Sequence, residues 1–394
     1  MIQRHLATRI RDAATQMPVV SVTGPRQSGK TTLCRQLFPG YFYANLEDPE
    51  TRSFALNDPR GFLAQGPNGM VIDEAQYAPL LFSYIQVLVD EQKQNGAFVL
   101  SGSQNFLLME RITQSLAGRV AIFYLLPLSF HELQPTDFAT TSAWQLILNG
   151  GYPRIFDQGV DLNLFFSSYL QTYVERDLRQ LIQVSDLQQF QLFTRLTAGR
   201  VGQLFNQSAI ATEAGLSHPT VKKWFSLLET SFIAFTLPPY FRNFNKQLVK
   251  TPKVYFYDTG LACYLLGIRT VGELETHYAR GALFENFVIV EALKSFYNRG
   301  IRMPLYFWRD RSGHEIDLLF DTGGHLHPFE IKSGQTIQPD FFHNLAFFAG
   351  ISGLDTAETA LIYGGDLQQA RSQGKVVGWR GFPEYLASFP QIES

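Results

Sequence analysis

A glycine-rich segment near the start of the chain has the residue types of a phosphate-binding loop. Residues 24–31 have the spacing G-x-x-x-x-G-K-[ST] and directly follow the apolar run 19–22. Glycines let such a loop curl so that its N–H groups face phosphate oxygens, and the helix N-terminus that follows adds favourable partial charge. Lys30 can then reach the β- and γ-phosphates, and the Thr31 hydroxyl can ligate Mg²⁺. The residues expected to bind the nucleotide are Gly24, Pro25, Arg26, Gln27, Ser28, Gly29, Lys30, Thr31 and Thr32.

Two acids further along the chain complete this chemistry. Asp73 and Glu74 directly follow the apolar residues 70–72. A carboxylate at the carboxyl end of a strand neighbouring the phosphate loop is placed to hold magnesium, which predicts this role for Asp73. Glu74 would then be the general base that orients and activates water. Acids at a strand end are commonly only solvated, and it is the loop at Gly24 that favours the catalytic interpretation.

Two polar positions extend the predicted site. Ser103, in the polar run 101–105 after an apolar strand, could touch the γ-phosphate or the attacking water, although such a run can also be an ordinary strand cap. Arg119 stands just before the apolar run 120–125. An arginine there could enter a neighbouring subunit's nucleotide site and neutralise developing charge, or it could be a plain surface residue.

The elements that must position these residues follow from hydrophobic patterning. The continuous apolar runs are Val19–Val22, Met70–Ile72, Phe98–Leu100 and Val120–Leu125. Such runs are typical of buried parallel strands, and helical patterns such as 80–93 lie between them. This alternation predicts a doubly wound α/β sheet. Residues 131–200 are expected to be helical, 205–260 to form two short helices and then strands, and 280–365 to form a helix followed by strands.

Composition limits the classes of protein. The chain has 394 residues, a hydrophobic fraction of 45%, a charged fraction of 17% and a formal net charge of −2. These values exclude disorder and a generally basic nucleic-acid coat. Cys34 and Cys263 cannot form a disulfide framework or a zinc site by themselves, which fits a reducing compartment. Since we find neither a signal peptide nor a membrane-length apolar stretch, we expect a cytoplasmic protein without membrane contact.

A basic segment lies in the middle of the chain. Residues 207–216 indicate a short helix, and Ser217 is a good N-cap for a second one, so the spacing is that of a helix–turn–helix. Residues 217–257 contain six Lys or Arg, Lys253 among them, and a single acid, Glu229. Such a patch could bind DNA phosphates, although helix–turn–helix units also serve as protein-packing modules. The lysines expected to contact DNA are Lys222, Lys223, Lys246 and Lys250.

A carboxylate–lysine pattern follows in the last third of the chain. If Gly323-Gly324 is a two-residue hairpin turn, Asp317 faces Glu330 and Glu315 faces Lys332 across the hairpin.

Carboxylates that close together repel one another unless a cation or a proton lies between them, and Mg²⁺ is the natural occupant of such an oxygen site. Glu285, on a helix expected over 283–296, could supply a third oxygen. Lys332 could orient the attacking water or stabilise charge on a phosphate. As a bare spacing the pattern is weak, because any acidic hairpin can produce it.

Several of these segments together resemble a known family. They are Gly24–Thr31, Ile72–Gln76, Ser101–Ser103, Ala117–Arg119, Tyr173–Asp177 and Thr251–Leu261. They are similar to bacterial and archaeal AAA-type ATPases that pair an N-terminal AAA domain with a C-terminal domain of unassigned function. The resemblance implies an α/β protein with a AAA+ P-loop NTPase core over 1–130, a helical lid over 131–200, a winged helix over 201–270 and a PD-(D/E)XK restriction-endonuclease-like domain over 271–394.

The resemblance also implies cofactors, an assembly and residue roles. ATP and Mg²⁺ are the expected cofactors, and a homo-oligomeric ring, such as a hexamer, is the expected assembly. Lys30 and Thr31 take the phosphate and Mg²⁺ roles, Asp73 and Glu74 the metal and water roles, Ser103 the sensor role and Arg119 the finger role. A second sensor arginine is not obvious, and its candidates are Arg154, Arg176 and Arg200. The D…E-x-K pattern resembles the metal site of restriction-endonuclease-like nucleases.

Three functions remain open from the sequence. The first is an ATP-hydrolysing motor or remodeller that acts on DNA, with a Mg²⁺-dependent nuclease as a further activity. The alternative is an ATP-dependent conformational switch that binds a protein partner and carries a catalytically silent nuclease-like domain. A small-molecule kinase is the third, and the Asp73–Glu74 pair argues against it because it favours transfer of phosphate to water.

Overall fold

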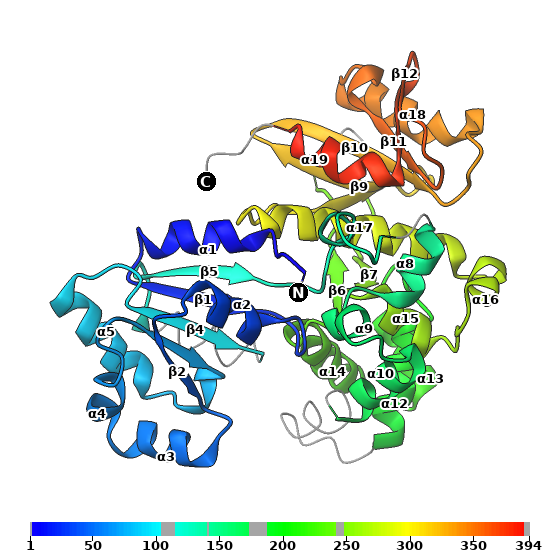
Figure 1. Cartoon of the computed structure of the whole chain (residues 1–394). Coiled ribbons are helices and arrows are strands. Elements are labelled where there is room, and N and C mark those ends of the chain that lie inside the picture. The colour runs from blue at the N-terminus through cyan, green and yellow to red at the C-terminus, as the bar shows by residue number, and fades with distance from the viewer. Residues whose placement is uncertain (1, 104–114, 140–141, 173–186, 242–247, 390–394) are drawn as a thin grey trace.

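The computed structural model describes residues 2–103, 115–139, 142–172, 187–241 and 248–389. Three units are visible in Figure 1: a sheet flanked by helices, a mainly helical middle unit and a C-terminal sheet. The long helix α17 (Arg280–Asn298) runs between the C-terminal sheet and the other two units (Figure 1). None of the helices in the described ranges is long and apolar enough to cross a bilayer.

The first unit is a five-stranded sheet in the order β2-β3-β4-β1-β5, and all its neighbouring strands pair in parallel. Its strands are β1 (Val19–Thr23), β2 (Phe42–Asn45), β3 (Met70–Asp73), β4 (Phe98–Gly102) and β5 (Val120–Tyr124). The predicted α/β class with a parallel sheet and all four predicted strands are confirmed. Strand β2 was missed because it is a short edge strand, exposed at Phe42 and without a continuous apolar run.

The expectation that the acids stand on a strand next to the phosphate loop was wrong. Strand β4 lies between β1 and β3. The order of strands is set by the crossover connections, which local hydrophobicity does not reveal. The edge on which the residues meet is nevertheless as expected, since all five strands point the same way.

Helices cover both faces of this sheet. They are α1 (Leu6–Ala14), α2 (Lys30–Leu37), α3 (Pro49–Asn57), α4 (Pro59–Leu63) and α5 (Leu81–Gln92). Leu6, Ile10 and Leu33 from α1 and α2 share a core with Val20 of β1. Helices α3, α4 and α5 pack on the opposite face. Because neither face meets water, every residue of β1 is buried, and three of its five residues are valines.

The middle unit contains most of the remaining helices and a two-stranded antiparallel sheet. Its helices are α7 (Phe130–Leu133), α8 (Ala143–Asn149), α9 (Pro153–Asp157), α10 (Leu162–Tyr169), α12 (Leu187–Ala198), α13 (Gln207–Ala214), α14 (His218–Thr230), α15 (Thr259–Leu265) and α16 (Val271–Thr276). Its strands are β6 (Ala234–Leu237) and β7 (Lys253–Phe256). Ser217 caps α14, as predicted, by accepting a hydrogen bond from Thr220 N at 3.2 Å. The helix–turn–helix is followed by a strand pair, and its assignment as a winged helix stays a prediction.

The connection between β6 and β7 is hydrogen-bonded to the C-terminal sheet. Tyr240 N donates to Phe307 O at 2.7 Å, and Phe307 N donates to Pro238 O at 3.1 Å. On the return path, Val249 N donates to Arg309 O at 3.0 Å. The middle and C-terminal units are therefore joined through backbone pairing.

The C-terminal unit is a mixed six-stranded sheet in the order β12-β13-β11-β10-β9-β8. Its strands are β8 (Tyr306–Arg309), β9 (Glu315–Thr322), β10 (His325–Lys332), β11 (Ala360–Tyr363), β12 (Gln369–Arg371) and β13 (Gly374–Gly378). Helices α17, α18 (His343–Ser352) and α19 (Phe382–Ala387) pack against it. Thr322 pairs with His325, so the predicted Gly323-Gly324 turn is confirmed. The ladder continues to Leu318 and Phe329, and the next pair in this register is Asp317 with Glu330.

A buried aspartate fixes the fold of the middle unit and provides a test of it. Asp258 is 3% exposed and accepts hydrogen bonds from Leu261 N at 2.9 Å and Gly151 N at 2.8 Å, so it caps α15 and ties it to the end of α8. Asp258→Ala should cost about 3 kcal/mol in the free energy of unfolding, because two buried N–H groups lose a charged acceptor. Urea unfolding measures the change.

The matched control is Asp161→Ala, which removes the exposed cap of α10, a hydrogen bond from Leu164 N at 2.9 Å. That loss should be about 1 kcal/mol. Equal losses in the two variants would contradict the buried tie.

Candidate nucleotide-binding site

The phosphate loop joins the end of β1 to the start of α2, and its glycines are required by its geometry. Gly24 has φ 151°, and a Cβ there would lie 2.2 Å from Leu125 O. Gly29 has φ 93° and is the N-cap of α2, without a side-chain capping bond. The first N–H groups of α2 therefore lack a side-chain acceptor at the mouth of the loop, which suits an anionic ligand.

Lys30 lies within the curl of the loop. Its Nζ donates to Gly24 O at 3.0 Å and to Pro25 O at 2.8 Å, and the residue is only 5% exposed. Burial lowers its pKa, whereas the charges of Glu74 and Asp73 oppose that change. Within the described ranges no acid forms an ion pair with this ammonium. A phosphate would supply the missing anion.

Asp73 and Thr31 meet at the expected place for a metal. Thr31 Oγ1 donates to Asp73 Oδ2 at 2.6 Å, and Tyr43 OH donates to the same oxygen at 3.0 Å. The Ser101 hydroxyl, on the intervening strand β4, donates to Asp73 Oδ1. A hydroxyl oxygen and a carboxylate in contact are the donor set that Mg²⁺ prefers, so the residues present fit the ion. Sequence reasoning missed Tyr43, because nothing in its neighbourhood marks it.

Glu74 is held by the residue predicted as sensor. Its backbone is left-handed, with φ 54°, directly after β3. Glu74 Oε2 accepts hydrogen bonds from Ser103 N at 3.2 Å and Ser103 Oγ at 3.0 Å. Gln76 Nε2 donates to the same oxygen at 2.5 Å. Ser103 therefore positions the carboxylate that was predicted to act as the base.

A cavity of about 580 Å³ opens beside the loop. Loop residues such as Lys30 and Thr31 line one side, and residues of α9 and α10, including Arg154 and Tyr169, line the other. This volume lies in the range of small-molecule sites. Helices α9 and α10, which follow the first sheet in the sequence, thus complete the cavity.

One of the three candidate second-sensor arginines lies in this cavity. Arg154 lines it and donates from Nε to Gln158 Oε1 at 2.9 Å. Arg200 instead donates to Leu196 O at 2.9 Å and pairs with Glu213 of α13, away from the loop. Arg176 lies outside the described residues. Arg154 is therefore the candidate that the geometry favours.

The residue Arg4, just before α1, supports the loop from behind and was not foreseen. Its buried guanidinium donates to Ser28 O at 2.7 Å, to Leu126 O at 2.6 Å and to Glu132 Oε1 at 3.0 Å. The pKa of Glu132 is lowered because this arginine and backbone donors outweigh the effect of burial. No local pattern marks Arg4, since its partners are far along the chain.

Arg119 lies at the opposite edge of the sheet from the loop. It directly precedes β5, at the amino ends of the strands, and forms a two-point ion pair with Asp90 of α5 at 2.6 and 2.9 Å. The nucleotide site of the same subunit lies at the carboxyl ends of the strands. A finger role could therefore be played only in another subunit, and it stays a prediction.

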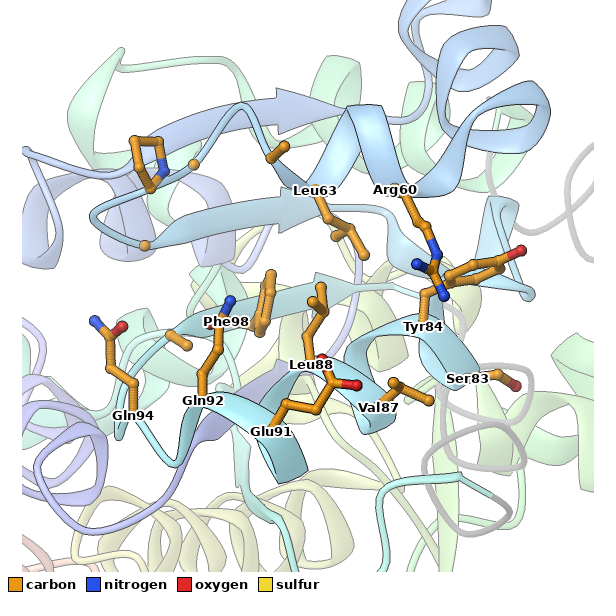
Figure 2. A pocket seen from close by; sticks show the side chains of 15 residues that line it. Arg60, Leu63, Ser83, Tyr84, Val87, Leu88, Glu91, Gln92, Gln94 and Phe98 are labelled. Carbon is orange, nitrogen blue, oxygen red and sulfur yellow. The ribbon is translucent and has the colours of Figure 1, made fainter.

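A second cavity, of about 590 Å³, lies between α4 and α5 (Figure 2). Leu63, Leu88 and Phe98 supply apolar walls, with Arg60 and Tyr84 at one end (Figure 2). Phe98 begins β4, so this cavity is at the amino edge of the sheet, remote from the phosphate loop. Its walls are mostly apolar, and we do not assign it to the nucleotide.

The predicted nuclease-like residues lie together in the C-terminal unit. Lys332 Nζ pairs with Glu330 Oε1 at 2.6 Å, and Asp317 Oδ2 accepts from Ile331 N at 2.8 Å. Burial and the charge of Glu330 raise the pKa of Asp317 well above its usual value. Glu285 also joins this cluster.

The cluster also contains the ammonium of Lys253, a residue that we had counted in the basic segment. Lys253 is 3% exposed, and its Nζ lies 2.9 Å from Glu285 Oε1 and 3.9 Å from Asp317 Oδ1. In the described part of the chain no group of three or more acids, histidines or cysteines is arranged to hold a metal. The carboxylates as they stand do not fit Mg²⁺, and nuclease activity stays a prediction.

Three of the four lysines expected to contact DNA lie among the described residues. Lys222 and Lys223 are exposed on α14, and Lys250 is exposed on the return path to β7. Lys246 lies outside the described residues. Their contact with DNA stays a prediction.

Comparisons with known proteins agree with the site. Residues 16–134 match the family model described as AAA domain. Residues 140–271 and 280–382 match two models described as domains of unknown function, DUF8612 and DUF4143 respectively. The loop geometry and the first match together define the class of protein: it is a P-loop ATPase of the AAA type.

The chain belongs to the same family as two uncharacterized mycobacterial proteins. The relatives in Mycobacterium bovis and Mycobacterium tuberculosis are each 34% identical over 372 residues, which covers 92% of this chain and 80% of theirs. An uncharacterized protein of Haemophilus influenzae is 25% identical over 241 residues, 58% of each chain.

Similar solved structures include the Walker-type ATPase of Pyrococcus abyssi, with 14% identity and a TM-score of 0.44 over 66% of this chain and 94% of that one. AMPPCP-bound DnaA of Aquifex aeolicus has 13% identity and a TM-score of 0.30 over 57% and 85%. These likenesses are too weak to support an argument about function.

Two substitutions separate nucleotide binding from turnover. Lys30→Ala should abolish ATP binding, because the phosphates lose the cation inside the loop. Glu74→Gln should keep binding and lower turnover by about a hundredfold or more, because the base is lost. Calorimetry with ATP and release of inorganic phosphate measure the two effects. Normal turnover in both variants would contradict the site.

The arginine of the cavity can be tested against a matched arginine outside it. Arg154→Ala should weaken ATP binding by about tenfold or more, because a charged hydrogen-bond donor leaves the cavity. Arg200→Ala, which breaks the pair with Glu213, should leave affinity unchanged. Calorimetric titration with ATP compares them, and equal affinities in the two variants would exclude Arg154.

Proposed function

We propose that this ATPase binds Mg·ATP in the cavity beside the loop. Hydrolysis moves the middle and C-terminal units against the first sheet, and the exposed face of α14 contacts DNA during this cycle. The single observation that carries the catalytic part is the meeting of Thr31, Asp73 and Glu74 at one edge of the sheet, with Lys30 beside them.

The side chains have separate tasks in hydrolysis. Lys30 and the N–H groups at the start of α2 bind the phosphates, and Thr31 with Asp73 would hold Mg²⁺, which supplies neutralisation of phosphate charge. Glu74, positioned by Ser103, takes a proton from the water that attacks the γ-phosphorus. The bond from the γ-phosphorus to the bridging oxygen breaks, and ADP leaves with the bonding electrons.

A path of direct contacts supports coupling to the rest of the molecule. Leu128 and Phe130 follow β5, the strand whose end packs on Gly24. Leu128 O accepts from Lys294 Nζ at 2.9 Å, and Phe130 N donates to Glu291 Oε2 at 2.8 Å. Both partners are buried residues of α17. These contacts give a movement of the loop a direct route to α17, the helix that packs against the C-terminal sheet.

The DNA part of the proposal rests on charge. Lys222 and Lys223 are neighbours on the exposed side of α14, while Glu229, the acid of that helix, is half-buried and accepts a hydrogen bond from Thr236 Oγ1 at 2.9 Å. The exposed face is thus basic in a chain whose net charge is −2. Two lysines on one helix face suit phosphate contact without base-specific readout.

A second candidate function is a switch that binds a protein partner. It is favoured by Lys253, whose ammonium pairs with carboxylates that were predicted to hold the nuclease metal. In both candidates we propose a homo-oligomer, in which Arg119 of one subunit completes the nucleotide site of the next.

DNA contact is tested by reversing charge on α14. Lys222→Glu with Lys223→Glu should weaken duplex binding strongly and reduce the slope of log affinity against log salt by about 2, since each phosphate contact contributes about 0.9. Fluorescence anisotropy with labelled duplex, single-stranded and branched DNA at two salt concentrations measures this.

Lys93→Glu, at an exposed lysine after α5, is the control and should leave both values unchanged. Phosphate release without DNA should be normal in all these proteins, which keeps failure of DNA binding separate from failure of the ATPase. A wild-type protein with no DNA affinity at low salt would favour the protein-binding switch.

A further inference from the structure

A buried lysine from outside the C-terminal unit lies among that unit's carboxylates. Lys253 is the first residue of β7 and belongs to the segment 140–271, whereas its acidic partners belong to the segment 280–382. Its Nζ is 2.9 Å from Glu285 Oε1 and 3.9 Å from Asp317 Oδ1. Glu315 is also in direct contact with it.

The surroundings keep this lysine charged. Burial alone would lower its pKa, but Glu285, Tyr255, Asp317 and Glu315 together raise it well above its usual value. A buried ammonium without partners is very costly, and removing one member of a buried pair is strongly destabilising. The Tyr255 hydroxyl further donates to Glu285, so the acceptors around the lysine are held in place.

The cluster holds two further cations besides Lys253. Lys332 pairs with Glu330 at 2.6 Å, and Arg309 Nη1 pairs with Glu315 Oε2 at 3.0 Å. With Lys253 included, three cations face four carboxylates. A divalent ion that bridged these carboxylates would have to displace an ammonium that the chain itself supplies.

We propose that Lys253 occupies the place of the divalent metal in this carboxylate cluster and makes it an ionic latch between the middle and C-terminal units. While the latch is closed, the C-terminal sheet has no metal-dependent phosphodiester chemistry. The latch lies beside the backbone pairing of Tyr240 and Val249 with β8, so the two units are fastened at adjacent points. The proposal holds whether or not α14 contacts DNA, and in the ATP cycle it makes the two units move as one body.

The first test removes the lysine and asks whether a metal takes its place. Without nucleotide, the full-length Lys253→Met variant should unfold at a lower temperature than wild type, and MnCl₂ should restore part of the loss. Its Mn²⁺ affinity by calorimetry should exceed that of wild type by about tenfold or more, because the competing cation is gone. Lys253→Arg should respond as wild type does.

A matched control is Lys294→Met. Lys294 is also buried, but it pairs with one carboxylate, Glu291 at 2.9 Å, and so its loss should destabilise the protein without creating a response to Mn²⁺. If Lys253→Met folds and gains no Mn²⁺ affinity, the proposal is wrong. If Lys294→Met gains as much Mn²⁺ affinity as Lys253→Met, the effect is not specific to the latch, and the proposal is also overturned.

A measurement that does not depend on the lysine variant covers the case in which Lys253→Met fails to fold. Wild type and Asp317→Asn are titrated with Mn²⁺ and incubated with supercoiled plasmid and Mn²⁺. Equal Mn²⁺ binding and no cleavage that depends on Asp317 support the latch. Mn²⁺ binding or plasmid cleavage that is lost in Asp317→Asn would show a working metal site and overturn the proposal.

Discussion

The hydrogen bond between Thr31 and Asp73 is the contact on which the rest of the site depends. It joins residues 42 positions apart at 2.6 Å, across a sheet in which another strand separates β1 from β3. The Ser101 hydroxyl, on that intervening strand, donates to the other oxygen of Asp73. The order of strands thus brings an acid, two hydroxyls and the phosphate loop to one edge.

The charges at this edge are complementary to a metal–phosphate ligand and not to one another. Lys30 donates to loop carbonyls, and the start of α2 has no side-chain cap. Asp73 and Glu74, in turn, accept only from neutral donors among the described residues. An anion alone would neutralise the charge of Lys30 but not those of Asp73 and Glu74. A cation alone would neutralise the two acids but not the lysine. A triphosphate with its metal would satisfy both the lysine and the acids.

Much of this site could be predicted because its residues are set by local geometry. The curl needs glycine at positions 24 and 29, the strands are continuous apolar runs, and the hairpin at Gly323-Gly324 follows from its turn residues. The interactions that sequence could not reveal are those between distant segments. Arg4 supports the loop through three partners from distant parts of the chain. Lys253 was interpreted as part of a basic surface, although it is buried and four acidic and phenolic groups interact with its charge. Charge counts along a chain describe composition, not neighbours.

One helix, α17, contacts both the segment after β5 and the lysine of the carboxylate cluster. Glu291 and Lys294 of α17 hold the backbone just after β5, and Glu285 of the same helix reaches Lys253. At a rise of about 1.5 Å per residue, these points lie only about 9–14 Å apart along the axis. Since α17 is continuous and largely buried over this stretch, its contact with the end of β5 and the proposed latch lie on one uninterrupted element. The phosphate loop packs on Leu125 at that same strand end, so the nucleotide site and the carboxylate cluster are connected by one strand and one helix.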